Sequence, residues 1–377
     1  MKNIIILFGG SSAEHEVSVI SGLQVLENID RKKYTPFAIK LTKENLFKYY
    51  DRFENRKDYL KIKPQIISFG KDDQGSYFQT SGLLKSKTYI DGAYLAFHGG
   101  NGESGQVQGF LETLDIPYTS PNVEASVISM NKQVTKQILN EYGIKTVEGV
   151  SVCDEDIKAD VNKVVKNIKL KLPVIIKPAH LGSSIAINIA KTNVELKKYL
   201  LEAAQVDTEI VVEKLIKDFK EYNVSVRRIN GEIITSEIEK PLSSDEILSF
   251  ADKYQRGGKK TGGMASLQRE LPAKISKNQE KEIKNLAIDV FKAIRAKGMV
   301  RIDFMLSGPP AQAGKNLYVT EVNPIPGSMS FYLWEASGVS FKEQVTDLIE
   351  QSFKDQEERL SKRLDYKSDI IEKFVNQ

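Results

Sequence analysis

The residues best suited to chemistry are three oxygen-bearing side chains near the C-terminus: Asp303, Glu321 and Asn323. Asp303 falls in an apparent strand over residues 299–306, and the other two fall in a second strand over residues 317–323. Side chains two apart in a strand share a face, so Glu321 and Asn323 point the same way. Oxygen ligands without Cys or His suit Mg²⁺, which keeps waters and shares substrate phosphate oxygens. The pattern therefore predicts a nucleotide-dependent active site.

The segment between these two strands decides whether the oxygens meet. Residues 307–316 are rich in Gly and Pro and predict a hairpin connection. Antiparallel pairing with Leu306 near Leu317 then places Asp303 roughly opposite Glu321. The hairpin is therefore expected to direct both carboxylates toward one cation.

Arg301 lies two residues before Asp303 and shares its face of the strand, where it adds a fixed positive fork for a phosphoryl group or an oxyanion. The alternative is a solvated, charged strand with no site. Asp303 stands between Ile302 and Phe304, and an unpaired charge among apolar neighbours is costly unless it is paired or binds a metal. We therefore favour the metal site.

A second candidate site follows the apolar strand that ends at Lys177. The small residues Gly182, Ser183 and Ser184 come soon after it and allow backbone N–H groups to approach phosphate oxygens, with the lysine as a point charge. This is not a Walker A loop, because a strand over residues 185–190 follows it instead of a helix. A plain β-hairpin turn fits this motif equally well.

Two further candidates lie near the N-terminus. Glu14 closes a Gly/Ser loop between a strand and a helix, where N–H groups favour an anion and the acid can bind a ligand ammonium group. His98 follows a short strand at the usual ligand edge of an α/β unit. A hydrogen-bonded turn histidine is a close alternative for His98.

The elements that must position these residues alternate between strand and helix in the first 120 residues, which indicates a parallel α/β domain. Residues 50–90 are polar and irregular and are expected to be a strand-and-loop insertion, and residues 117–121 are expected to be a linker. The predicted strands cover residues 4–8, 34–41 and 94–97, and the predicted helices cover residues 15–28 and 106–114.

The rest of the chain predicts an α+β arrangement. A helix over residues 129–142 should end at Gly143, a C′ glycine, and the charged, Gly-rich segment 240–263 is expected to be a functional lid. The last twenty-odd residues predict a charged helix with an apolar stripe. Further strands are expected over residues 172–177, 209–215 and 223–229, and a further helix over residues 279–297.

Length and composition limit the classes of protein. A chain of 377 residues predicts two or three domains, and its formal net charge of +4 without a long basic block argues against a nucleic-acid partner. The single cysteine, Cys153, excludes an intrachain disulfide and is expected to be a small buried side chain. No segment approaches the ~18 consecutive apolar residues of a membrane span, so we expect a cytoplasmic protein.

Five segments taken together resemble the D-alanine–D-alanine ligases of the ATP-grasp superfamily, from residue 1 to about residue 355. Each segment alone is a weak match, but all five occur in the order of the family. They are Phe8-Gly9-Gly10-Ser11-Ser12-Ala13-Glu14-His15-Glu16-Val17-Ser18, His98-Gly99-Gly100-Asn101-Gly102-Glu103-Ser104-Gly105 with Gln108-Gly109, Lys177-Pro178 with Gly182-Ser183-Ser184, Arg301-Ile302-Asp303, and Glu321-Val322-Asn323 with Pro326-Gly327.

The resemblance implies an N-terminal α/β substrate domain over residues 1–120, a central ATP-grasp lobe over 121–215 and a C-terminal lobe over 216–377 that carries the lid and a C-terminal helix. It implies an ATP-dependent ligase that joins two D-alanines through an acyl phosphate for peptidoglycan synthesis, and so for cell-wall biogenesis and cell shape. It also implies two Mg²⁺ ions, with Mn²⁺ as a substitute, and a cytoplasmic homodimer.

The resemblance further assigns roles around ATP. Lys132 and Lys177 contact the phosphates, Glu213 with Leu215 meets the adenine, and Glu221 takes the ribose hydroxyls. The other implied ATP contacts are Ser183, Ser184 and Lys253, and the implied metal ligands are Asp303, Glu321 and Asn323.

Roles around the amino-acid substrates are implied in the same way. Glu14 binds the ammonium group of the first D-amino acid and is tied to Ser183 and Tyr254. His98 sits beside that substrate. The oxyanion is stabilised by Arg301 and by the Gly327 N–H.

One departure from the family leaves the second substrate open. The segment after Gly327 reaches Leu333-Trp334-Glu335 about four residues early, which removes a Ser-Leu pair that holds the second substrate's carboxylate in relatives. The alternatives are a ligase with another acceptor, such as D-lactate, D-Ser or another amino acid, and a non-catalytic nucleotide-binding relative. A dinucleotide-dependent dehydrogenase is disfavoured because no G-x-G-x-x-G follows the first strand.

Overall fold

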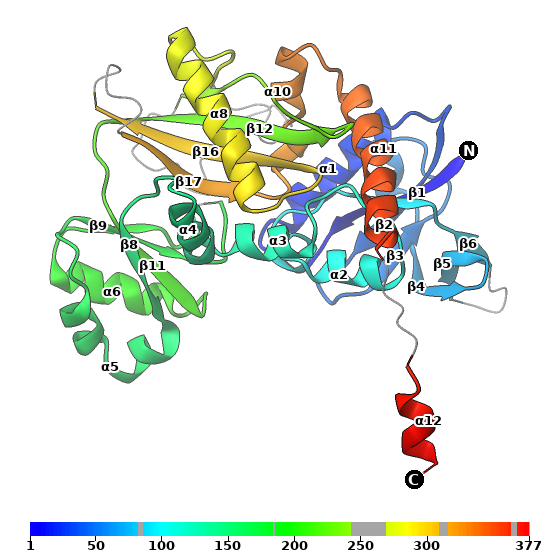
Figure 1. Cartoon of the computed structure of the whole chain (residues 1–377), viewed down its shortest axis with the longest axis horizontal. Helices are drawn as coiled ribbons and strands as arrows, with labels where there is room; N and C mark the ends of the chain where they lie inside the picture. Colours follow the sequence, from blue (N-terminus) through cyan, green and yellow to red (C-terminus); the bar gives the residue numbers. More distant parts are fainter. Residues whose placement is uncertain (82–85, 184, 243–268, 309–315, 363–367, 377) are drawn as a thin grey trace.

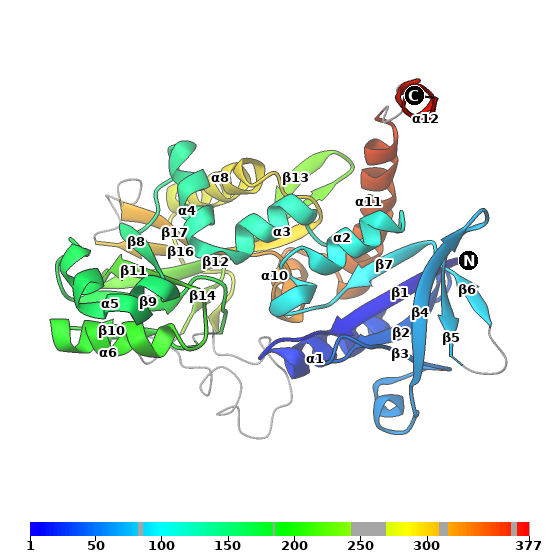
Figure 2. The ribbon, with the colours of Figure 1, turned by 90° about the horizontal axis from the view of Figure 1, so that it is seen from below.

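The computed structural model describes residues 1–81, 86–183, 185–242, 269–308, 316–362 and 368–376. Three main sheets follow one another along the chain and are covered by helices, which confirms the predicted α/β and α+β class. The first and second sheets lie at opposite ends of the molecule, and the third lies between them (Figures 1 and 2). No helix in the described ranges is both long and apolar enough to span a lipid bilayer.

The first sheet has seven strands in the order β6-β5-β4-β3-β2-β1-β7. β1 pairs in parallel with β2 and β7, and its run from Ile4 to Phe8 is completely buried, as expected for a central parallel strand. The strands are β1 (Lys2–Gly9), β2 (Tyr34–Leu41), β3 (Phe47–Tyr50), β4 (Gln65–Asp72), β5 (Gly75–Thr80), β6 (Lys87–Tyr89) and β7 (Gly92–Leu95).

Residues 50–90 are not an irregular insertion. β3 to β6 form an antiparallel meander that extends the first sheet, and the short helix η1 (Arg56–Leu60) is the main excursion from it. Aromatic rings stabilise the meander, with Phe78 packed edge-on against Phe37 at 5.5 Å between ring centroids. These strands bury only one face, so polar residues alternate with apolar ones and the segment has the overall composition of a loop.

The segment 117–121 is also not a free linker. The Ala93 N–H donates to the Pro117 carbonyl over 2.8 Å, and the Thr119 N–H donates back to the Ala93 carbonyl over 3.2 Å. Thr119 and Ser120 are buried. The segment therefore extends the edge of the first sheet beside β7.

Helices α1 (His15–Asn28) and α2 (Gln106–Thr113) accompany the first sheet, and α1 has the predicted bounds. From the other end of the chain, α11 (Phe341–Leu360) contributes Phe341, Val345 and Leu348 to the same core. The apolar stripe therefore lies in α11. The last residues do include a helix with apolar side chains, α12 (Ile370–Val375), but Ile370, Ile371 and Phe374 are exposed and the helix buries no residue.

The second sheet has the order β10-β9-β11-β8, and α5 (Asp154–Asn167) and α6 (Asn193–Ala203) cover one face of it (Figure 1). Ile176 and Val212 point toward these helices, so their neighbours Lys177 and Glu213 point to the opposite face. Cys153 is exposed at the end of β8, which contradicts the expected burial. The strands are β8 (Gly149–Cys153), β9 (Val174–Pro178), β10 (Asn188–Ala190) and β11 (Glu209–Lys214).

The predicted helix over 129–142 is two helices, α3 (Val123–Met130) and α4 (Lys132–Glu141), separated by Asn131. Asn131 has an extended backbone, and its side-chain oxygen accepts hydrogen bonds from the Gln133 and Val134 N–H groups. An asparagine that caps a helix start in this way cannot also continue a preceding helix. The predicted C′ glycine, Gly143, has φ +71°, consistent with that role.

The third sheet is antiparallel, in the order β13-β12-β16-β17, and α8 (Lys277–Ala293) packs on it. The predicted hairpin is confirmed: Leu306 pairs with Leu317 and Asp303 pairs with Glu321, beside a register irregularity after Asp303. The strands are β12 (Phe219–Ile229), β13 (Glu232–Thr235), β16 (Met299–Ser307) and β17 (Leu317–Asn323), and the smaller elements are β14 (Lys240–Pro241), β15 (Arg269–Glu270), η2 (Gly100–Gly102), η5 (Gly327–Ser330) and α10 (Phe331–Ala336).

Candidate active site

One pocket collects side chains from all three sheets. Its lining combines the loops after β1 and β7, the α3–α4 junction, the loop after β9 and the β16–β17 hairpin. The lining residues are Glu14, His98, Glu103, Ser129, Met130, Lys132, His180, Leu181, Gly182, Ser183, Arg301, Asp303, Glu321, Val322, Asn323, Pro324, Ile325 and Gly327.

Most of the site residues predicted from the sequence meet in this pocket. Those in the lining are Glu14, His98, Lys132, Ser183, Arg301, Asp303, Glu321, Asn323 and Gly327. Lys177, Glu213, Leu215 and Glu221 are described but are not in the lining. Ser184, Lys253, Tyr254 and most of the proposed lid 240–263 lie outside the described residues.

The β16–β17 hairpin holds its charged groups in fixed pairs. Arg301 grips Asp303 in a bidentate contact, with Nε 2.7 Å from Oδ1 and Nη2 2.8 Å from Oδ2. The Asn323 amide donates to the Oδ2 of Asp303 over 3.1 Å. Two parallel N–H···O bonds fix direction as well as charge, so Asp303 is oriented before any ligand arrives.

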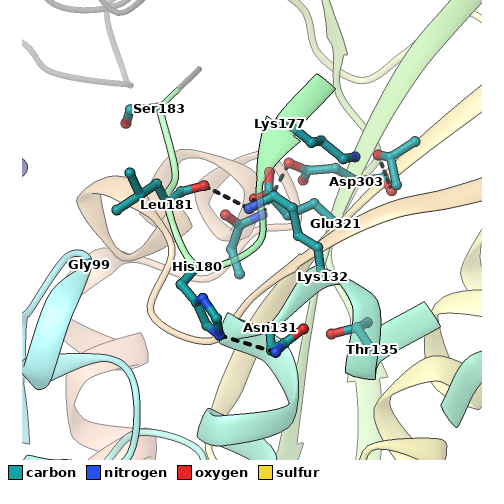
Figure 3. A network of polar contacts seen from close by, with 12 residues as sticks. Gly99, Asn131, Lys132, Thr135, Lys177, His180, Leu181, Ser183, Asp303 and Glu321 are labelled. Carbon is teal, nitrogen blue, oxygen red and sulfur yellow. Dashed lines mark hydrogen bonds and ion pairs between the residues drawn. The ribbon is translucent and has the colours of Figure 1, made fainter. Parts of the chain in front are cut away.

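Lys132 connects this hairpin to the loop after β9. Its Nζ lies 3.0 Å from the Oε1 of Glu321 and donates to the Leu181 carbonyl over 2.7 Å (Figure 3). The Lys132 N–H also donates to the Ala179 carbonyl. A single buried ammonium group thereby sets the distance between β17 and the Gly/Ser loop.

The loop after β9 reaches the N-terminal region through a hydrogen bond between the Ser183 hydroxyl and Glu14. Two glycines, Gly99 and Gly182, lie close to the same carboxylate. A Cβ atom on Gly99, where φ is +65°, would lie 2.9 Å from the Oε2 of Glu14, and a Cβ atom on Gly182 would lie 3.3 Å from that oxygen. Larger residues at either position would displace Glu14 or the loop. The geometry thus unites Glu14 and Ser183.

His98 is neutral and fully engaged. Burial lowers the pKa of His98 to about 4. Its Nδ1 lies 3.0 Å from the Ile325 carbonyl, which only accepts, so Nδ1 carries the proton and Nε2 accepts from the Ser21 hydroxyl at 2.7 Å. His98 therefore connects the loop after β17 to Ser21 in α1.

Glu103 holds the same loop, and no role for it followed from the sequence. Its Oε2 accepts from the Gly99 N–H at 2.6 Å, and its Oε1 accepts from the Ile325 N–H at 2.8 Å. Burial, followed by the negative charge of Glu14, raises the pKa of Glu103 to about 8. An acid five residues after His98 in a glycine loop was the only sequence signal for it.

The charge balance of the pocket bears on metal binding. Its lining has four carboxyl groups, on Glu14, Glu103, Asp303 and Glu321, but only two permanent cations, on Lys132 and Arg301. The described residues contain no cluster of three or more His, Cys, Asp or Glu that could hold a metal on its own. The donors at the hairpin are two carboxylates and one amide, a hard-oxygen set that fits Mg²⁺ with phosphate or water completing its shell.

A second charged group lies on the face of the second sheet opposite α5 and α6. The Oε1 of Glu213 is 2.8 Å from the Nζ of Lys136, and its Oε2 is 2.8 Å from the Nζ of Lys177. Burial alone would raise the pKa of Glu213, but the two lysines outweigh burial and lower it. The sequence did not predict a role for Lys136, because Glu213, its partner, is distant in the chain.

Taken together, the geometry places an oriented carboxylate hairpin, a lysine-held loop with small residues and a carboxylate from the first sheet around one polar space. Such an arrangement can bind a phosphorylated ligand on its basic and N–H-bearing side and an ammonium group at Glu14.

Comparisons with known proteins agree with this geometry. A family model described as the D-ala D-ala ligase N-terminus matches residues 3–121, and one described as the D-ala D-ala ligase C-terminus matches residues 138–350. A D-alanine–D-alanine ligase of Thermosipho africanus is 35% identical over 366 residues, which cover 96% of each chain.

Two solved structures are also similar to this chain. The D-alanine-D-alanine ligase of Coxiella burnetii has a TM-score of 0.78 and 26% identity, and the match covers 95% of this chain and 96% of that one. The D-Ala:D-Ser ligase of Enterococcus faecalis has a TM-score of 0.75 and 26% identity, over 93% of this chain and 99% of that one.

Proposed function

This chain belongs to the D-alanine–D-alanine ligase family, and we propose that it is an ATP-dependent ligase that joins two D-alanines for peptidoglycan synthesis. The observation that carries the proposal is the meeting of the Arg301–Asp303 hairpin, the Lys132-held loop and Glu14 in one pocket.

The reaction has two steps. A carboxylate is a poor electrophile, so one of its oxygens first attacks the γ-phosphorus of ATP, and ADP leaves to give an acyl phosphate. The amine of the second D-alanine then attacks the acyl carbon. The tetrahedral oxyanion collapses as phosphate leaves and the nitrogen loses a proton. Water must be excluded while the acyl phosphate exists, because hydrolysis would waste it.

The pocket residues divide these tasks. Glu14 binds the ammonium group of the first D-alanine, and its contact with Ser183 orients it. Arg301 and the Gly327 N–H stabilise the oxyanion. Because His98 and Glu103 hold the carbonyl and N–H of Ile325, they set the position of the backbone that leads to Gly327.

We assign the metal site to Asp303, Glu321 and Asn323, supported by the excess of carboxyl groups in the pocket. Bound there, two Mg²⁺ ions, or Mn²⁺ in their place, neutralise triphosphate charge. A cation held by Glu321 would compete with Lys132 for that carboxylate, which would make the lysine available to phosphate.

The remaining ATP contacts are proposed by family resemblance. Lys177 contacts phosphate, Glu213 and Leu215 meet the adenine, and Glu221 holds the ribose. Ser183, Ser184, Lys253 and Tyr254 complete the phosphate and substrate contacts. The pairing of Lys177 with buried Glu213 supports a fixed position for its ammonium group.

We also propose the division into domains 1–120, 121–215 and 216–377, under which each domain contains one of the three main sheets. A cytoplasmic homodimer is proposed from the family alone.

The test is ADP release from the purified protein with ATP, Mg²⁺ and D-Ala alone, compared with D-Ala plus D-Ser or D-lactate. Release with D-Ala alone, with D-Ala-D-Ala as the product, supports the proposal. Release only after D-Ser or D-lactate is added would favour the mixed ligase, an alternative kept open by similarity to the D-Ala:D-Ser ligase. No release with any pair would reject ligation.

A further inference from the structure

His180 anchors the base of the loop that carries Gly182 and Ser183. Its backbone N–H donates to the Oδ2 of Asp207 over 2.7 Å, and its ring Nδ1 lies 2.8 Å from the Oδ1 of the same carboxylate. The side chain of Asp207 is only 5% exposed, whereas that of His180 is 42% exposed, so the carboxylate is buried and the ring is partly open to solvent. Asp207 therefore fixes the positions of both the backbone N–H and the imidazole ring of His180.

The other ring nitrogen of His180 faces Asn131, at the break between α3 and α4. The Nε2 of His180 lies 3.1 Å from the Nδ2 of Asn131 (Figure 3). The orientation of that amide is determined by its other contacts, because Oδ1 accepts from Gln133 and Val134 while Nδ2 donates to Glu209 over 2.8 Å. A rotated amide would lose the helix cap and place its oxygen against a carboxylate.

These contacts select one form of the imidazole. Asn131 presents an N–H donor to Nε2, so Nε2 must accept, and Nδ1 must carry the proton that it donates to Asp207. A second proton on Nε2 would point at the Asn131 NH₂ group and remove that hydrogen bond. Only the neutral Nδ1–H form can therefore bridge Asp207 and Asn131.

We propose that His180 is a positioning residue for the Gly182–Ser183 loop, and that its neutral Nδ1–H form holds the loop against the start of α4 in the geometry that binds nucleotide phosphate. Protonation breaks the Asn131 contact and loosens the loop. The inference rests on the proposed function in one respect, because the loop is taken to face ATP. The contacts themselves do not depend on that function.

The charged groups around His180 shift the pH at which this change occurs upward. Asp207 hydrogen-bonds to the ring and raises the pKa of His180, partly opposed by burial; Glu209 adds to the rise and Lys132 opposes it. Lys132 also holds the Leu181 carbonyl, so the loop keeps one tether when the Asn131 contact is lost. The effect should therefore be a graded weakening of binding.

The experiment measures the affinity of a non-hydrolysable ATP analogue with Mg²⁺ between pH 5.5 and pH 8.5, in the wild type and in His180→Asn. The asparagine can keep the bond to Asp207 but neither titrates nor reaches Asn131. We expect wild-type binding to be about fivefold tighter at the alkaline end, the value of one hydrogen bond, and to converge on the variant at the acidic end. Parallel pH profiles for the two proteins would overturn the proposal.

Asn131→Asp, made together with Glu209→Gln so that the new oxygen meets an amide donor and not a carboxylate, provides a matched second variant, because aspartate caps a helix as well as asparagine does but presents an acceptor to Nε2. It should favour the protonated ring and reverse the pH dependence, with tighter binding at the acidic end. A variant that keeps the wild-type pH dependence would contradict the assigned role of the amide. A uniform loss of affinity at every pH would point to a purely structural contact and would also overturn the proposal.

A measurement without nucleotide separates this inference from the proposed function. The chain has three histidines, so ¹⁵N NMR can assign the His180 ring by comparison with His180→Asn. We expect the Nδ1–H tautomer at pH 8.5, and amide shifts of Gly182 and Ser183 that follow the ring's titration. An Nε2–H tautomer would overturn the proposal even if ligase activity is found. Chemical shifts of the Gly182 and Ser183 amides that stay constant while the His180 ring titrates would also overturn it. A wild type that binds no nucleotide but shows both signals would reject the proposed function and leave the loop anchor standing.

Discussion

The second and third sheets each carry a group of charged side chains, and the two groups are built differently. On the second sheet, Glu213 gives one oxygen to Lys136 and the other to Lys177, and its side chain is only 7% exposed. On the third sheet, Asp303 gives both oxygens to one arginine, and Glu321, whose side chain is 32% exposed, pairs with Lys132 at the pocket wall.

The two groups differ in how far their carboxylates are buried, and burial decides whether a carboxylate can bind a ligand. The Glu213 carboxylate is nearly covered, and breaking its pairs would leave charges in a medium that cannot solvate them. The hairpin group faces the pocket, so its carboxylates can exchange protein partners for a cation. We infer that the Glu213 group fixes the position in which Lys177 meets its ligand, whereas the hairpin group changes partners during the reaction, and four substitutions can test this division.

The largest effect is expected from Asp303→Asn. It keeps the size of the side chain but removes the charge that holds both the proposed metal and Arg301. Turnover should fall at least about a thousandfold, which corresponds to about 4 kcal/mol of transition-state stabilisation. ADP release with D-Ala measures it, and circular dichroism checks that the fold survives. Turnover within tenfold of the wild type would refute the metal role.

Glu213→Gln should damage the fold more than any other single change at the cleft. It leaves two buried lysines without their shared anion, and we expect the free energy of unfolding to drop by about 3–5 kcal/mol in urea titrations. The control is Glu202→Gln, which breaks an exposed pair with Lys198 and should cost less than about 1 kcal/mol. Similar losses in both variants would remove the distinction between the two charged groups.

Arg301→Lys tests whether the bidentate fork matters beyond its charge. A lysine can make one contact with Asp303 where the arginine makes two. We expect kcat/KM to fall by about 10- to 100-fold, while the thermal midpoint changes little. If activity stays within twofold of the wild type, the orientation of Asp303 does not depend on the fork.

The effect of Glu103→Gln is spread over a range of pH and appears as a pH dependence of stability. Because burial raises the pKa of Glu103 to about 8, the folded protein binds a proton there that the unfolded chain has lost. Wild-type stability should therefore fall as pH rises from about 5 to 8, by about 1 kcal/mol per pH unit relative to the variant. Urea titrations at several pH values check this, and identical slopes would place the Glu103 proton elsewhere.

Local patterns predicted the elements well where one periodicity dominates. The bounds of α1 and β2 and the pairing of Leu306 with Leu317 follow from alternation and helical spacing. The predicted helix over 129–142 failed because propensity does not show that Asn131 turns its oxygen onto the next helix. Residues 50–90 contain the expected strands and loops, but their pairing into a meander on the first sheet did not follow from the sequence, because a meander buried on one face has the composition of a loop.

The candidate site could be predicted only as separate motifs. Asp303 and Glu321 lie on one hairpin, so their meeting followed from local register. Lys136 and Glu213 lie 77 residues apart, and His98 lies 227 residues from Ile325. Such pairs depend on which faces of distant elements pack together, and many alternative pairings are compatible with the same sequence.

The sequence by itself determined the types of chemistry available, namely hard oxygen ligands, an arginine fork, small residues for phosphate and an acid at a helix start. It also determined the local geometry of the hairpin, because a strand's alternation needs no information from the rest of the chain. Only the tertiary structure decided which charges are buried together, which nitrogen of His98 carries the proton, and that His180 joins Asp207 to Asn131. The reason is that burial and hydrogen-bond direction are properties of packed surroundings, which arise only when the three sheets are assembled.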